Sequence, residues 1–269
     1  MDVLPGRADH RDEGVRRPAL PGQLTNPPTH QLWLNVEHRV ATRLQRGMPF
    51  SPGSQSRLTT FDLPRFPSES LFDRVGRAVC RAGCLPRKEL YESWEVARRV
   101  RRRLRGGRVI ELACGHALAS HLLLLLDDSS PHAIAVDVRP APSAARLAAE
   151  LVLDWPRLEG RVSIRERPIA EIEIQAGDLV VSVHACGSLT DDVLSMAIGG
   201  GASVSVLPCC HDVRQGDTGG LGGWLDGPLA TDVRRAERLR AAGHAVHTQV
   251  IPAAITPKNR LLIGIPLNR

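Results

Sequence analysis

From residue 108 onward, short apolar runs alternate with longer segments whose apolar residues recur at helical spacing. The runs have the length and β-branched content of strands. They cover 108–114, 132–138, 161–167, 178–185 and 202–209, and the helical segments cover 117–126, 144–154, 189–198 and 229–243. This alternation predicts a parallel sheet with helices on both faces.

Two further apolar runs, 244–253 and 260–267, are separated only by "AITPKN". This connection is too short for a parallel crossover, so the two runs should pair antiparallel. The sequence therefore predicts a doubly wound α/β fold. Its sheet has seven strands, is mostly parallel, and has an antiparallel final strand.

The region before residue 107 has a different pattern. Residues 1–65 are rich in Pro, Gly, Arg and Ser, and we expect a largely disordered or irregular leader with one short helix over "HQLWLNVEHRVATRLQRG". Residues 66–106 have helical periodicity and should form a helical segment that packs on the main domain. The main domain is expected over 107–269.

The amino-acid composition is that of a globular protein. Of the 269 residues, 42% are hydrophobic and 24% are charged, as in globular domains. No apolar run approaches the roughly 20 residues that span a bilayer, and the N-terminus has no signal-peptide core. We therefore expect a cytoplasmic protein with no membrane association.

The six cysteines do not form CxxC pairs, so reduced thiols are expected rather than a disulfide framework.

The net charge of +6 permits an anionic partner such as RNA. Arginines are concentrated in 98–108, directly before the first strand. One interpretation is a solvated helix face, and the other is an edge that binds RNA phosphates. Oligomeric state cannot be read from the sequence.

The first strand-to-helix turn, "IELACGHALAS", contains candidate ligand-binding residues. Glu111 lies in the apolar strand and Gly115 follows four residues later, where a glycine lets a ligand approach the backbone at a helix N-terminus. Asp137 ends the second strand about 20 residues after this turn, a spacing typical of a carboxylate that binds ribose hydroxyls. The alternatives are a helix entry without ligand and a helix-capping aspartate.

These stretches, together with "DLVVSVHACGSLTD", "LPCCH" and "ITPKNRLLIG", resemble class I S-adenosylmethionine-dependent methyltransferases, which have a Rossmann-like fold. The resemblance extends from about Arg98 to Arg269. The pairing of "HACG" with "PCCH" resembles a subgroup that includes tRNA 2′-O-methyltransferases and the methyltransferase domain fused to glutathione-transferase-like modules.

The resemblance implies S-adenosyl-L-methionine as cofactor and assigns residues to it. Glu111, Ala113, Gly115 and His116 would line its methionine part, Asp137 would hold its ribose, and Arg167 would lie near its adenine. The residue after the third strand is often acidic in this family, and "RERPIAEI" has no Asp there. Adenine recognition would then depend on backbone groups.

The fourth strand would end beside the transferred methyl group. His184 is the only side chain there that can act as a base near neutral pH, although it could instead brace a loop by a hydrogen bond. Cys186 could be a packed small side chain or a nucleophile, and Gly187 would border the substrate.

The resemblance also places Cys209, Cys210 and His211 in the wall of the acceptor pocket. Lys258 and Asn259 lie in the final hairpin, where they could border that pocket or form a turn. Because "LPCCH" ends the strand next to the fourth, its two cysteines and its histidine could approach His184 and Cys186, and four N/S ligands within reach would suit zinc. Adjacent cysteines are expected to point in different directions, however, and no CxxC knuckle is present, so we predict no metal site.

The predicted function is methyl transfer to an O or N acceptor, with RNA favoured over a small molecule. The contrasting interpretation is a non-catalytic module that keeps the fold and has lost turnover.

Overall fold

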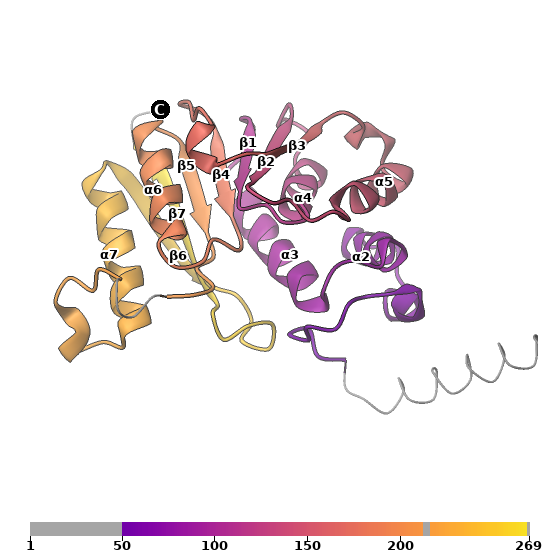
Figure 1. Cartoon of the computed structure of the whole chain (residues 1–269), viewed down its shortest axis with the longest axis horizontal. Helices are drawn as coiled ribbons and strands as arrows, with labels where there is room; N and C mark the ends of the chain where they lie inside the picture. Colours follow the sequence, from indigo (N-terminus) through magenta and orange to yellow (C-terminus); the bar gives the residue numbers. More distant parts are fainter. Residues whose placement is uncertain (1–49, 212–215, 268–269) are drawn as a thin grey trace, which may run out of the picture. The chain divides into compact units, whose positions relative to one another are not determined.

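The computed structural model describes residues 50–211 and 216–267, which form a seven-stranded sheet flanked by helices (Figure 1). The strand order is β3-β2-β1-β4-β5-β7-β6. Strand β7 is antiparallel to both of its neighbours, and the other pairs are parallel. The predicted fold class is therefore confirmed. The strand order reverses between β1 and β4, the place where open α/β sheets form a ligand crevice.

The helices and strands follow the predicted alternation closely. The strands are β1 (Val109–Leu112), β2 (Ala133–Asp137), β3 (Val162–Glu166), β4 (Leu179–Ser182), β5 (Ser203–Val206), β6 (His244–Val250) and β7 (Arg260–Pro266). The helices are α2 (Leu71–Ala82), α3 (Arg87–Arg101), α4 (Leu118–Leu126), α5 (Ala144–Asp154), α6 (Leu189–Gly199) and α7 (Gly227–Ala241). None of these helices is both long and apolar enough to cross a membrane.

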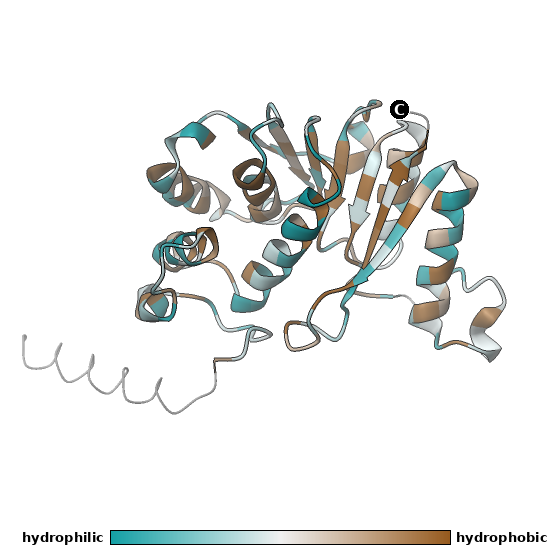
Figure 2. Ribbon diagram, turned by 180° about the vertical axis from the view of Figure 1, so that it is seen from behind, coloured by the Kyte–Doolittle hydropathy of each residue, from teal (hydrophilic) through white to brown (hydrophobic). Residues whose placement is uncertain are grey.

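The two faces of the sheet are covered by different helices. Val109 and Val181 pack with side chains of α2 to α5, whereas the adjacent Ile110 and Val180 pack with side chains of α6 and α7. Strands β1, β4 and β5 are buried along their whole length, and the centre of the sheet is accordingly hydrophobic in Figure 2. Continuous apolar runs are what a sheet covered on both faces requires.

The N-terminal prediction is only partly covered by the structure. Of the predicted leader 1–65, residues 1–49, including the expected short helix, lie outside the described residues. The described part contains a 3-10 helix, Thr60–Arg65. The predicted helical segment 66–106 contains α2 and α3, and Ser70 caps α2 by accepting a hydrogen bond from the backbone N–H of Asp73.

The strand predicted over 178–185 was too long at its end. Strand β4 ends at Ser182, whose carbonyl accepts a hydrogen bond from Leu207 N. The chain then bends toward α6, and Gly187 adopts a left-handed conformation with φ +59°. His184 therefore lies in the loop after β4 rather than in the strand.

Most arginines of 98–108 are paired within the protein. Arg98 and Arg99 pair with Glu95, Arg101 and Arg105 pair with Asp127, and Arg108 pairs with Asp178. Arg101 is buried, with 3% of its surface exposed, and also donates to Ser130 Oγ and to the carbonyl of Leu123. Its role is thus to join α3 to the end of α4.

We predict that Arg101→Met lowers the free energy of unfolding by about 3 kcal/mol, because it leaves the buried Asp127 carboxylate without its buried partner. The matched control is Arg102→Met. Arg102 is exposed, so this change should stay within about 0.5 kcal/mol of wild type. Urea unfolding measures both, and equal effects would contradict the assignment.

Candidate functional site

The carboxyl ends of β1, β2 and β4 surround a cavity of about 320 Å³. Of the residues predicted to form the site, six line it: Glu111, Ala113, Gly115, His116, Asp137 and His184. The volume lies at the lower end of the range for small-molecule sites. The structure therefore brings together the predicted base and all of the predicted cofactor residues except Arg167.

The turn between β1 and α4 has an unusual backbone. Three of its residues, Ala113, Gly115 and Ala117, have left-handed φ values of 56°, 52° and 58°. For alanine this conformation costs roughly 1–2 kcal/mol, and such strain tends to cluster at functional sites. A β-carbon placed on Gly115 would meet no atom within 4 Å, so the turn presents bare backbone to open space.

Asp137 holds this turn in place. One carboxylate oxygen accepts the N–H of Gly115 at 3.0 Å and the other accepts the N–H of Arg139 at 2.9 Å. In addition, the N–H of Cys114 donates to the carbonyl of Val136. The ends of β1 and β2 are thereby joined on either side of the cavity.

Glu111 is a buried carboxyl group on the floor of the site. It is 4% exposed, and one of its oxygens accepts the N–H of Ser120 at 2.7 Å. Burial raises the pKa of Glu111 to about 7, and the nearby Asp137 carboxylate adds to the rise. Near neutral pH, a cation bound in the cavity would favour its ionised form.

His116 lines the cavity beside Ser143 and Glu89. Its Nε2 lies 3.0 Å from Ser143 Oγ and its Nδ1 lies 3.6 Å from a carboxylate oxygen of Glu89. Hydrogen bonding with Cys84 and Glu89 raises the pKa of His116 to about 9 despite its partial burial. Burial opposes ionisation of the Cys84 thiol, but His116 outweighs it and lowers the pKa of Cys84.

His184 is half-buried at the cavity wall. Burial lowers the pKa of His184 below its ordinary value of 6.5, although Glu92 and Glu89 act in the opposite direction. The ring is therefore neutral at pH 7 and able to accept a proton. No hydrogen bond links its ring to the described residues.

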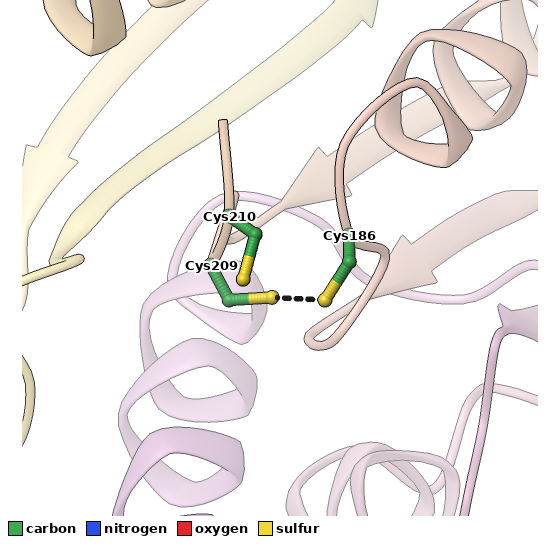
Figure 3. A group of neighbouring side chains, drawn as sticks. All are labelled: Cys186, Cys209 and Cys210. Carbon is green, nitrogen blue, oxygen red and sulfur yellow. Dashed lines mark hydrogen bonds between the residues drawn. The ribbon is translucent and has the colours of Figure 1, made fainter. Parts of the chain in front are cut away.

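A second group of predicted residues lies in the loops after β4 and β5. The sulfur atoms of Cys186, Cys209 and Cys210 all lie within 4.8 Å of one another, as Figure 3 shows. The premise that adjacent cysteines would point apart was therefore wrong. The N–H of Gly187 donates to the carbonyl of Cys210 at 3.1 Å, which joins the two loops.

His211 is held away from the thiols by helix α7. Its Nε2 lies 2.7 Å from Asp232, which also pairs with Arg235 and Arg260. The side chain of His211 is 2% exposed, and its Nδ1 has no hydrogen-bond partner among the described residues.

Three further predicted residues belong neither to the cavity wall nor to the group around the cysteines. Arg167 is exposed, and only its backbone N–H approaches the site, by donating to the carbonyl of Asp137 at 2.9 Å. Lys258 is exposed in the β6–β7 connection. Asn259 hydrogen-bonds with Ile251 through both backbone and side chain, as a turn residue does.

The sequence interpretation missed the contribution of α3 to the cavity. Leu85, Glu89 and Ser93 line it from the N-terminal helical segment. Glu89 and Ser93 are four residues apart and so lie along one side of α3, whereas Leu85 precedes the helix. These two polar residues beside the apolar face of the helix were the available signal, but nothing in the sequence indicated which element they would face.

The raised pKa of Glu111 predicts a pH dependence of stability. Between its ordinary value of 4.5 and about 7, the folded state keeps a proton that the unfolded state releases. Stability should therefore fall as pH rises through this window, by at most about 1.4 kcal/mol per pH unit from this group.

Glu111→Gln removes this contribution and keeps an acceptor for the Ser120 N–H. Its free energy of unfolding should rise relative to wild type as pH increases from about 4.5 to 7. The control is Glu159→Gln at an exposed site. Parallel pH profiles for Glu111→Gln and wild type, measured by urea unfolding, would contradict the assignment.

Comparison with curated proteins finds no match. Among solved structures, an O-methyltransferase family protein from Burkholderia thailandensis is 19% identical, with a TM-score of 0.46 over 88% of this chain and 70% of that chain. The m1A22 tRNA methyltransferase TrmK from B. subtilis is 16% identical, with a TM-score of 0.43 over 64% of this chain and 65% of that chain.

The apo form of the S-adenosylmethionine-dependent methyltransferase SibL is 18% identical, with a TM-score of 0.44 over 88% of this chain and 75% of that chain. Residues 88–215, which supply the whole cavity lining except Leu85, match the model of a family described as a methyltransferase domain.

Proposed function

We propose that this chain is an S-adenosylmethionine-dependent methyltransferase whose cofactor binds in the cavity at the ends of β1 and β2. The observation that carries the proposal is the position of Gly115 and Asp137 in one cavity at the reversal of the strand order. The match of residues 88–215 to a methyltransferase domain family supports it.

The carboxyl groups that line the cavity fit a cofactor that has a ribose and a positive charge. Each Asp137 oxygen accepts one backbone N–H, and an ionised carboxylate has about four lone-pair sites. Asp137 therefore retains the capacity to accept two ribose hydroxyls. The open space at Gly115 lets a ligand contact the turn, and the Glu111 carboxyl group is placed to favour a cation.

S-adenosylmethionine supplies a methyl group on a sulfonium, which is already a good leaving group. The protein then has to align the acceptor and remove its proton. His184 is suited to this role because it is neutral at pH 7, lines the same cavity and has no described hydrogen-bond partner. The protonated His116 is placed to hold a carboxylate, such as that of the methionine part.

The acceptor is an O or N nucleophile. If RNA bound through the segment 98–108, its phosphates would contact Arg102 and Arg103, which are exposed after α3. The other arginines of 98–108 are paired with carboxylates of the protein. The segment therefore has less unpaired positive charge to bind phosphates than its sequence suggests. This favours a small-molecule acceptor more than the sequence alone did.

Asp137→Ala should lower the affinity for S-adenosylmethionine by about 10- to 100-fold, because it removes a charged acceptor of two hydrogen bonds. Calorimetric titration measures this affinity, with Asp192→Ala on α6 as an exposed control. An unchanged affinity in Asp137→Ala would show that the ribose lies elsewhere. A folded wild-type protein that does not bind the cofactor would overturn the proposed function.

His184→Ala should lower turnover by about 100-fold or more for a hydroxyl acceptor and leave cofactor affinity nearly unchanged. The acceptor can be identified by incubation with radiolabelled cofactor and fractionated extract. In wild type, turnover should decline as pH falls below 6.5 and His184 becomes protonated.

The control for this variant is His132→Ala, at the amino end of β2 and exposed. Full turnover in His184→Ala would remove His184 as the base. Cofactor binding without transfer to any acceptor in wild type would favour the non-catalytic module.

A further inference from the structure

The geometry points to a metal site that is separate from the cofactor cavity. We propose that Cys186, Cys209 and Cys210 bind one Zn²⁺ ion through their three sulfur atoms. The site would connect the loops that follow the neighbouring strands β4 and β5.

The distances between the thiols suit a common metal ion. All three sulfur atoms lie within 4.8 Å of one another, and those of Cys186 and Cys209 are 2.9 Å apart. Tetrahedral Zn²⁺ with Zn–S bonds of about 2.3 Å separates its sulfur ligands by about 3.8 Å. Figure 3 shows the three side chains converging from the two loops.

The backbone brings the thiols together without help from a metal. Gly187 N–H donates to the carbonyl of Cys210 at 3.1 Å, and Arg235 of α7 donates to the carbonyl of Gly187 at 3.0 Å. Arg235 also pairs with Asp191 at the start of α6. The two loops are therefore fixed relative to each other, and the site is preorganised.

The exposure of these cysteines distinguishes them from the other three. Cys80, Cys84 and Cys114 are buried, whereas Cys186 and Cys210 are exposed and Cys209 is half-buried. Buried cysteines serve as small apolar side chains. A converging exposed trio has no such packing role, and clustering thiols at a surface favours metal binding or oxidation.

The donor set selects the class of ion. Among the described residues, no carboxylate or imidazole joins the three thiols at the same distance. Soft sulfur ligands favour Zn²⁺ over Mg²⁺ and Ca²⁺. Three protein ligands leave a fourth position for water or another small ligand, which can enter because two of the cysteines are exposed.

The test is a metal titration of the full chain, made metal-free under reducing conditions. Zn²⁺ binding is measured by competition with a chromophoric chelator, and Co²⁺ binding by the thiolate-to-metal absorption bands. Wild type should bind one ion per chain. Cys186→Ser and Cys210→Ser should each weaken Zn²⁺ binding by about 100-fold or more.

Cys80→Ala is the matched control, because it removes a thiol that lies in the hydrophobic core outside the trio and should leave Zn²⁺ affinity unchanged. Circular dichroism checks that each variant is folded. Serine at two exposed positions should not disturb folding, so a loss of binding reports on the ligands.

Three results would overturn the proposal. The first is that wild type fails to bind Zn²⁺ stoichiometrically. The second is that Cys186→Ser binds Zn²⁺ with the same affinity as wild type. The third is that Cys186 and Cys209 form a disulfide in the native protein under reducing conditions. The titration needs no cofactor and no acceptor. Its outcome is therefore independent of whether the chain transfers methyl groups.

Discussion

The carboxylate of Asp137 is the constraint on which the candidate site depends. It accepts the N–H groups of Gly115 and Arg139, and so holds the β1–α4 turn against the end of β2. The turn contains two left-handed alanines, Ala113 and Ala117, whose conformation is unfavourable by roughly 1–2 kcal/mol each. Without this anchor the turn would relax, and the bare backbone at Gly115 would not be presented to the cavity.

The same cavity keeps its ionisable groups in different protonation states. Glu111 is buried with a pKa of about 7, His116 is protonated through its contacts with Cys84 and Glu89, and burial keeps His184 neutral. The two histidines differ because Cys84 and Glu89 raise the pKa of His116, whereas burial is the largest effect on His184 and lowers its pKa.

The elements that sequence analysis could predict are those determined by local pattern. Alternating apolar runs indicated all seven strands, and the spacing of Gly115 from Asp137 placed both in one cavity. Contacts between distant segments could not be derived this way. Glu89 and Ser93 reach the cavity only because α3 packs against its open side, and the pairing of Arg101 with Asp127 depends on where α4 ends. The adjacency of β4 and β5 did predict that the loops carrying Cys186 and Cys209 approach each other, but the directions of the adjacent side chains Cys209 and Cys210 depend on the loop backbone, which local pattern does not determine.

The most direct test of the account is a crystal structure of the protein with S-adenosylhomocysteine, the product form of the proposed cofactor. The account predicts the ligand in the cavity at the ends of β1 and β2, with the ribose hydroxyls within hydrogen-bond distance of Asp137 and the backbone of Gly115 against the ligand. Binding at another site, such as the cavity between α6 and α7 lined by Ser188 and Arg238, would contradict it.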